Sequence, residues 1–489
     1  MSAPTRIPGA TAPPGVVDDL DIGPLAAGYA AGAFTVPDVV EEVLARIAAA
    51  GDDRVWISRF SDDELRARAR ELQALLDSTR PGAGAPPLLG IPFAVKDSID
   101  VAGLDTTVAC PAYAYAPARS APIVDRLEAA GAICVGKTNL DQFASGLVGV
   151  RSPYGVSRNP FHPDYIPGGS SSGSAVAVSS GLVSFSLGTD AAGSGRVPAA
   201  LNDVIGLKPT RGLVSTAGFV PACRSVDCPS VFARSCTDAW RVLEVIAGYD
   251  DTDPYSRADA VREPRPGLTG AFRFAVPAAS DLEFEGDADA ERLYREALAT
   301  LDALGGTRVE IDYAPFLQAG ALLYEGPWVA DRLQFLGPFL AERGDALHPV
   351  TREIIAGGGR FSAVEAFAAL DRLELLKREA ARILREVDAL VLPTTPTTYT
   401  VAAVEADPFE LNRRLGYYTT FVNLLDLSAL AVPNGFRGDG LPQGVTLIAP
   451  ALGDATLAAL GAEFVRARRA PMEGTDDPAD GSTREEEYP

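Results

Sequence analysis

Two Gly/Ser-rich turns carry the residues of this sequence that are best suited to chemistry. Positions 167–174 read Pro-Gly-Gly-Ser-Ser-Ser-Gly-Ser, and positions 188–198 read Gly-Thr-Asp-Ala-Ala-Gly-Ser-Gly-Arg-Val-Pro. Glycines allow backbone N–H groups to converge on an anion, and a serine held there can act as a nucleophile. Such a serine needs a base, but the chain has only two histidines, His162 and His348, both in expected loops. Lysine is the obvious substitute, and Lys96 ends a strand-like apolar run.

These motifs resemble the amidase signature family. Lys96, Ser170 and Ser194 are spaced as in that family, with 24 positions between the two serines, and the segments 188–198 and 206–210 also match. The resemblance extends from about residue 88 to about residue 449. It implies that Ser194 is the nucleophile, Ser170 a bridge preceded by a cis peptide, and Lys96 the ultimate base. It also implies an oxyanion hole made of the backbone N–H groups of Ala191, Ala192, Gly193 and Ser194.

This combination of residues suits amide hydrolysis, which must activate a hydroxyl group and later protonate a poor nitrogen leaving group. A neutral lysine can take the proton of Ser194 through Ser170 and return it to the departing nitrogen. The lysine must be desolvated for this, and the apolar neighbours of Lys96 suit that role. The reaction needs no metal and no organic cofactor.

The sequence also matches a nucleotide-binding motif and a second nucleophile motif, and both interpretations are disfavoured. Residues 131–138 match the P-loop pattern, but their order is helix, glycine, strand, whereas a P-loop requires strand, loop, helix. Lys137 is therefore expected to be a surface or loop cation. Residues 169–173 match a nucleophile elbow with Ser171 as nucleophile and His348 as base, but no strand is expected before it. Ser171 is instead expected to brace the loop through hydrogen bonds.

Further stretches resemble one branch of the family, the allophanate hydrolases. Segments 110–115, 139–144 and 221–225 carry this likeness, as does Tyr-Glu-Gly-Pro-Trp-Val-Ala-Asp-Arg, which ends at Arg332. In that branch a tyrosine and an arginine hold the substrate carboxylate, which implies this role for Tyr324 and Arg332. Two helical turns would place both on one face, and arginine binds carboxylates bidentately. In the alternative, Arg332 pairs with a neighbouring acid and Tyr324 belongs to the core.

The resemblance implies hydrolysis of allophanate, a small anionic amide, to ammonia and carbon dioxide through N-carboxycarbamate. One alternative is an amidase of another small carboxylated or aromatic amide. A second is the amidase subunit of a tRNA-dependent amidotransferase. A non-catalytic binding protein is disfavoured because no member of the triad is missing. A homodimer is implied by the family only.

Composition limits the other functions. A net charge of −22 over 489 residues argues against nucleic acid as a partner. No uninterrupted apolar run is long enough to span a membrane, and the first residues lack the pattern of a signal peptide. The five cysteines are an odd number without zinc-ligand spacing, which favours buried free thiols and a cytoplasmic location.

Strands alternating with helices along the chain predict an α/β fold of the amidase-signature type. We expect a large mixed, mostly parallel central sheet covered by helices on both faces. Residues 88–95 should form the strand that delivers Lys96, and residues 315–340 should be largely helical. We expect a flexible N-terminus over 1–16, an amidase domain over 17–470, and an acidic disordered tail over 471–489.

Overall fold

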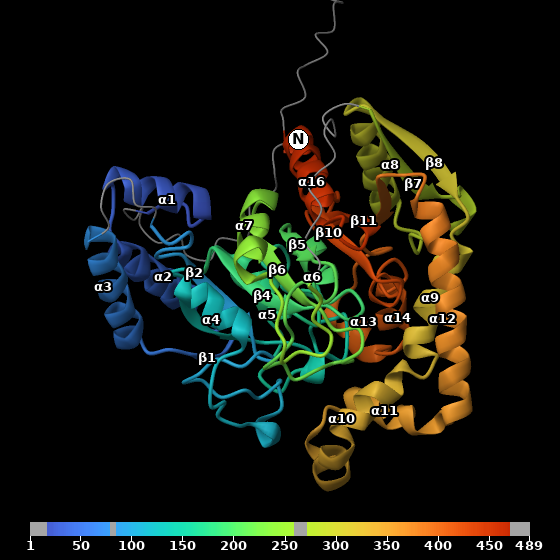
Figure 1. The fold of residues 1–489 in the computed structure, drawn as a ribbon, viewed down its shortest axis with the longest axis horizontal. Coiled ribbons are helices and arrows are strands. Elements are labelled where there is room, and N and C mark those ends of the chain that lie inside the picture. Colours follow the sequence, from blue (N-terminus) through green and yellow to red (C-terminus); the bar gives the residue numbers. More distant parts are fainter. Residues whose placement is uncertain (1–16, 79–84, 259–270, 470–489) are drawn as a thin grey trace, which may run out of the picture.

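An eleven-stranded sheet forms the centre of the protein, which we describe from a computed structural model (Figure 1). The structure describes residues 17–78, 85–258 and 271–469. The predicted flexible N-terminus and acidic tail therefore lie outside the described residues. The strands of the sheet are β1 (Trp56–Arg59), β2 (Pro92–Lys96), β3 (Ile133–Thr138), β4 (Phe185–Thr189), β5 (Ile205–Lys208), β6 (Pro229–Ala233), β7 (Phe272–Pro277), β8 (Gly306–Ile311), β9 (Ala389–Pro393), β10 (Leu427–Phe436) and β11 (Pro442–Pro450).

Helices surround this sheet. They are α1 (Ile22–Ala31), α2 (Val36–Ala50), α3 (Asp62–Ser78), α4 (Pro122–Ala129), α5 (Ser172–Ser179), α6 (Val197–Ala200), α7 (Cys236–Ile246), α8 (Ala288–Ala303), α9 (Ala314–Tyr324), α10 (Trp328–Arg343), α11 (Pro349–Ala356), α12 (Ala363–Leu384), α13 (Val401–Ala406), α14 (Glu410–Leu415), α15 (Phe421–Leu424) and α16 (Asp454–Arg469). Most strands in the middle of the sheet are buried at every position, which requires cover on both faces, as predicted.

The sheet is mixed, as predicted, but the expectation that it is mostly parallel is wrong. The strand order is β1-β3-β2-β4-β6-β5-β10-β11-β9-β7-β8. Of its ten neighbouring pairs, four are parallel: β2 with β3, β2 with β4, β7 with β8, and β7 with β9. One physical reason is the short connection between β10 and β11, residues 437–441, which is too short for a parallel crossover and makes a hairpin.

The parallel strands β2, β3 and β4 form the part of the sheet that matters most for chemistry. Because β3 and β4 both run parallel to β2, their carboxyl ends meet at one edge of the sheet. Helix α5 packs closely against these strands, and all of its residues are buried. Gly173 permits this approach, since a Cβ atom there would lie 2.7 Å from the backbone of Val55 and of Asn139.

The helices α9 to α12 lie along one flank of the molecule, with α10 and α11 at its lower end in Figure 1. The predicted helix over residues 315–340 is interrupted, because α9 ends at Tyr324 and α10 begins at Trp328. Pro327 supplies the reason: it has no N–H for the helical ladder, and it disfavours helical geometry in Gly326.

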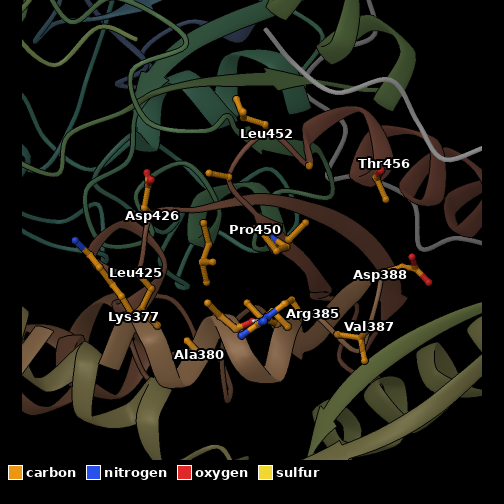
Figure 2. A pocket seen from close by; sticks show the side chains of 16 residues that line it. Lys377, Ala380, Arg385, Val387, Asp388, Leu425, Asp426, Pro450, Leu452 and Thr456 are labelled. Atoms are coloured by element: carbon orange, nitrogen blue, oxygen red, sulfur yellow. Dashed lines mark hydrogen bonds between the residues drawn. The ribbon is translucent and has the colours of Figure 1, made fainter. Parts of the chain in front are cut away.

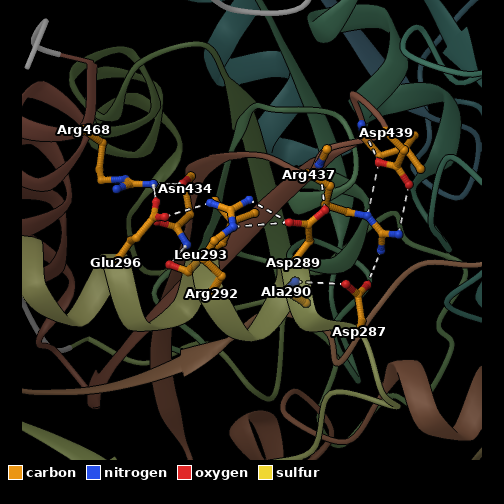
Figure 3. Close-up of polar contacts among 12 residues, drawn as sticks. Asp287, Asp289, Ala290, Arg292, Leu293, Glu296, Asn434, Arg437, Asp439 and Arg468 are labelled. Atoms are coloured by element: carbon orange, nitrogen blue, oxygen red, sulfur yellow. Dashed lines mark hydrogen bonds and ion pairs between the residues drawn. The ribbon is translucent and has the colours of Figure 1, made fainter. Parts of the chain in front are cut away.

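A polar network fastens α8 to the β10–β11 hairpin (Figure 3). Asp287 caps α8 by accepting the Ala290 N–H at 3.0 Å, and the same carboxylate pairs with Arg437 of the hairpin turn. Asp289 accepts the Gly438 N–H at 2.7 Å. Asp287 and Arg437 are largely buried, so this contact is shielded from screening by salt.

We expect Asp287→Ala to lower the free energy of unfolding by about 1–2 kcal/mol, because it removes a helix cap and leaves Arg437 without this partner. Thermal unfolding would measure the change. The matched control is Asp439→Ala, which removes a more exposed partner of the same arginine and should cost less than about 0.5 kcal/mol. Equal losses in the two variants would contradict this account of the network.

The structure also bears on two predictions made from the composition. All five cysteines are buried free thiols, as expected. Within the described part of the chain, no helix is both long and apolar enough to cross a membrane.

Candidate active site

Lys96 lies at the carboxyl end of β2, between β3 and β4, and its side chain is fully buried. The expected strand is thus present, but it runs from Pro92 to Lys96 instead of starting at residue 88. Its Nζ lies 2.7 Å from Ser170 Oγ and 2.8 Å from Thr189 Oγ1. Burial lowers the pKa of Lys96 to about 7, although the carboxylates around it act in the opposite direction. A large fraction of this amine is therefore neutral near pH 7.

Ser170 lies two residues before the start of α5, and the peptide bond between Gly169 and Ser170 is cis, as the family resemblance implied. The side chain is fully buried. The backbone oxygen of Ser170 accepts the Asp141 N–H at 3.0 Å. With its position held in this way, the hydroxyl faces the Lys96 amine, and a proton can move directly between the two.

Ser194 lies in the turn that leads from β4 to α6, five residues after Thr189. Its side chain is almost buried, and its hydroxyl makes no hydrogen bond with another described residue, Ser170 included. A buried ion pair holds the turn: Arg196 Nε lies 2.9 Å from Asp190 Oδ2, and neither side chain is exposed. The structure therefore brings Lys96 and Ser170 into direct contact. It places Ser194 on the turn that follows Thr189, the second residue that contacts Lys96.

The backbone N–H groups of the same turn bear on the expected oxyanion hole. Those of Ala191, Ala192 and Ser194 make no hydrogen bond with another described residue, although these residues are almost fully buried. Buried N–H groups are rarely left without an acceptor, which suits donors that await a ligand oxygen. The Gly193 N–H differs, since it donates to Asp190 Oδ1 at 2.8 Å. Of the four N–H groups expected in the oxyanion hole, that of Gly193 is therefore already engaged, and the other three are not.

Arg332 and Tyr324 lie close together, but for a reason other than the predicted one. They occupy two separate helices, α10 and α9, and the Arg332 guanidinium lies 5.9 Å from the centre of the Tyr324 ring. Arg332 is 4% exposed and donates to Ser145 Oγ at 2.9 Å. The alternative in which Arg332 pairs with an adjacent acid is wrong: within the described residues it forms no ion pair, and Asp331 instead accepts from Ser225. Its second half is partly met, since Tyr324 is half-buried and packs against the hydrophobic core.

The comparisons with known proteins agree with this arrangement. The family model described as Amidase matches residues 38–458. The chain belongs to the amidase family. It is 44% identical to the urea amidolyase of Saccharomyces cerevisiae over 84% of this chain and 22% of that protein. It is 36% identical to a glutamyl-tRNA(Gln) amidotransferase subunit of Symbiobacterium thermophilum, over 87% of this chain and 92% of the other.

The solved structures similar to this amidase include the allophanate hydrolase of Kluyveromyces lactis. That structure superposes with a TM-score of 0.84 at 40% identity and covers 91% of this chain and 72% of its own. A urea amidolyase of the same yeast gives the same TM-score, with 27% of its chain covered. The amidase thus spans about a fifth of the length of the curated urea amidolyase of S. cerevisiae, and the predicted α/β fold of this family is confirmed.

The two disfavoured motifs of the amidase have structural explanations. Residues 133–138 form β3, so the order helix, glycine, strand is observed and the P-loop reading fails. Lys137 is not a surface cation, however, because it is fully buried and lies 3.2 Å from Asp97. No strand precedes Ser171, whose hydroxyl donates to the Thr189 backbone oxygen at 3.2 Å; it braces the loop as expected and does not contact His348.

Sequence reasoning missed three contributors to the site of this amidase. Thr189 contacts Lys96, Ser145 contacts Arg332, and Asp227 is the carboxylate with the strongest influence on the pKa of Lys96. Thr189 could have been found, since it ends β4 as Lys96 ends the parallel strand β2. A cavity of about 650 Å³ lies elsewhere, between the end of α12 and the ends of β10 and β11 (Figure 2), and none of the site residues lines it.

Proposed function

We propose that this amidase hydrolyses allophanate, or urea-1-carboxylate, using Lys96, Ser170 and Ser194. The observation that carries the proposal is the buried Arg332, which has no carboxylate partner among the described residues. An unpaired buried guanidinium is unfavourable unless an anion joins it. An anionic amide supplies that anion. The similar structure from Kluyveromyces lactis is named allophanate hydrolase, after the same substrate.

The first half of the reaction releases ammonia. The neutral amine of Lys96 accepts the proton of Ser170, which takes the proton of Ser194 as that hydroxyl attacks the terminal carbamoyl carbon. The N–H groups of Ala191, Ala192 and Ser194 stabilise the oxyanion, each worth roughly 3–4 kcal/mol. The proton then returns along the same path to the departing nitrogen. Ammonia leaves, and the N-carboxylated carbamoyl group remains as an ester on Ser194.

The second half of the reaction restores the enzyme. Water attacks the ester carbonyl and gives up a proton through the same serine–lysine relay, and the Ser194 hydroxyl is re-formed. The product is N-carboxycarbamate, which decomposes to a second ammonia and carbon dioxide. The side chains of Tyr324 and Arg332 hold the substrate carboxylate in both halves, because an arginine fork matches the two carboxylate oxygens. No cofactor takes part in these steps.

Ammonia release by the purified chain tests the proposal. Allophanate should be hydrolysed faster than malonamate, biuret or simple aromatic amides, and Ser194→Ala should reduce release to the background rate. Turnover of aromatic amides without turnover of allophanate would overturn the assignment of the substrate.

A second candidate is the amidase subunit of a tRNA-dependent amidotransferase. It is supported by the match to nearly the whole length of the S. thermophilum protein. Activity that appears only with glutamine and added partner proteins would favour it. We also propose a cytoplasmic location, supported by the five free cysteines, and a homodimer on the family likeness alone.

A further inference from the structure

Asp227 is a buried acid that the proposed mechanism does not use. It is 6% exposed, and its Oδ2 accepts the backbone N–H groups of Ala222 at 2.7 Å and Cys223 at 3.3 Å. Its other oxygen, Oδ1, is also buried but has no hydrogen-bond partner among the described residues. Buried carboxylate oxygens without a partner are rare, because desolvation without compensation is costly. This oxygen is available to a ligand.

The backbone around Asp227 is fixed to the turn that carries Ser194. Asp190 and Cys228 exchange two backbone hydrogen bonds, of 2.7 and 3.1 Å. The side-chain amide of Asn423 donates to the backbone oxygens of both Asp190 and Val226, at 2.6 and 3.0 Å. The loop that carries Asp227 therefore lies beside the turn that carries the proposed nucleophile and oxyanion hole.

The other side of the same loop is fixed to the helix that carries Arg332. Asp331 accepts the Ser225 N–H at 3.0 Å and its hydroxyl at 2.7 Å, and the Cys223 thiol lies 3.7 Å from the backbone oxygen of Trp328. Asp227 also lines a cavity of about 120 Å³ whose wall includes Phe335, one helical turn beyond Arg332, but none of the proposed catalytic residues and not Arg332 itself. The loop of Asp227 is thus attached both to the turn that carries Ser194 and to the helix that carries Arg332.

The charges around Asp227 agree with this position. Burial raises the pKa of Asp227 to about 7, while the nearby Arg332 acts to lower it. The same carboxylate acts more strongly than any other on the pKa of Lys96. Asp227 is therefore influenced by the charge of Arg332 and itself influences the charge state of Lys96.

We propose that Asp227 Oδ1 accepts a hydrogen bond from the N–H group that joins the reacting carbonyl of the substrate to its carboxylate. In allophanate this N–H lies between the atom that Ser194 attacks and the group that Arg332 binds, so the inference rests on the proposed function. Asp227 then distinguishes a carboxylated urea from an amide that carries a methylene group at this place. It is a substrate-binding residue that determines specificity.

Asp227→Asn tests this hydrogen bond directly, because two backbone donors fix the orientation of the new side chain. The amide oxygen of the asparagine must face the N–H groups of Ala222 and Cys223, which turns its NH2 group toward the substrate. An acceptor is thereby replaced by a donor of the same shape. Malonamate is the matched substrate, since it has CH2 where allophanate has N–H. The ratio of kcat/KM for allophanate to that for malonamate should fall at least about tenfold in the variant.

Asp331→Asn is the matched control, because it also removes one negative charge from this neighbourhood, while its amide oxygen can still accept both hydrogen bonds from Ser225. It should leave the ratio unchanged. An unchanged ratio in Asp227→Asn, or an equal fall in Asp331→Asn, would overturn the inference. If the unsubstituted enzyme hydrolyses neither substrate, the proposed function itself fails, which is a separate outcome.

A measurement on the unsubstituted protein covers the case in which Asp227→Asn does not fold. Biuret and malonamide form a neutral pair that again differs by N–H against CH2. Biuret should bind at least about tenfold more tightly, as measured by competitive inhibition or calorimetry. Equal binding of the two would contradict a hydrogen bond to this N–H group.

Discussion

Lys96→Met should reduce kcat/KM for the amide substrate by roughly 10²–10⁴-fold, the range typical for loss of a general base. Methionine fills a similar volume and is apolar, which suits the fully buried position of Lys96, so the fold should be retained. What the variant lacks is the lone pair that accepts the proton of Ser170. Steady-state ammonia release measures the loss, and thermal unfolding checks the fold.

Lys137→Met is the matched control for Lys96→Met. Lys137 is equally buried and occupies the neighbouring strand β3, but it pairs with Asp97 and contacts neither serine. Its replacement should lower stability, because it leaves the Asp97 charge buried and unpaired. The chemical step of the folded fraction should be affected much less than in Lys96→Met. A loss of similar size per folded molecule in both variants would show that any change in this core stops the reaction.

The pH dependence of kcat/KM should report the protonation of the Lys96 amine. Lys96 acts as a base only when neutral, and burial lowers its pKa to about 7. Activity should therefore fall about tenfold per pH unit below pH 7 and level off above it. Because Asp227 raises the pKa of Lys96, Asp227→Asn should move this acid limb to lower pH. A limb that disappears in Asp227→Asn would assign the titration to Asp227 instead.

The catalytic candidates were accessible from the sequence because each belongs to a short local pattern. Lys96 ends an apolar run, and both serines lie in Gly/Ser-rich turns whose spacing is fixed along the chain. The contact between Lys96 and Ser170, by contrast, spans 74 positions and depends on the packing of α5 against β2. Only the family resemblance could supply that contact before the structure was known.

The misreading of Lys137 has a physical cause, which is a partner that is distant in sequence. Lys137 was expected at the surface because a lone lysine usually is, but Asp97 lies across the parallel pairing of β2 and β3 and allows burial. The free oxygen of Asp227 has no signature in the sequence at all, because it results from which N–H groups the loop turns toward the other oxygen. Local patterns predicted the reacting groups, while long-range packing decided their surroundings.

Arg332→Met should reduce kcat/KM for allophanate by roughly 10²–10³-fold, in line with about 3–4 kcal/mol for a buried charge contact with substrate, and should change turnover of a neutral amide such as biuret little. Arg343→Met, at the exposed end of the same helix, is the control and should leave both rates unchanged. Arg332→Lys keeps the charge but loses the bidentate fork, so it should recover only part of the rate.

The pH dependence of kcat/KM gives a second measurement for Arg332→Met. A purely structural role of Arg332 would not shift the acid limb of this profile. Arg332 lowers the pKa of Lys96 by charge repulsion, so its removal should shift the limb to higher pH, opposite to the shift in Asp227→Asn. The two variants, Asp227→Asn and Arg332→Met, should thus shift the same titration in opposite directions. Equal losses for allophanate and biuret, with an unmoved limb, would reduce Arg332 to a packing residue and leave the anionic substrate without its binding group.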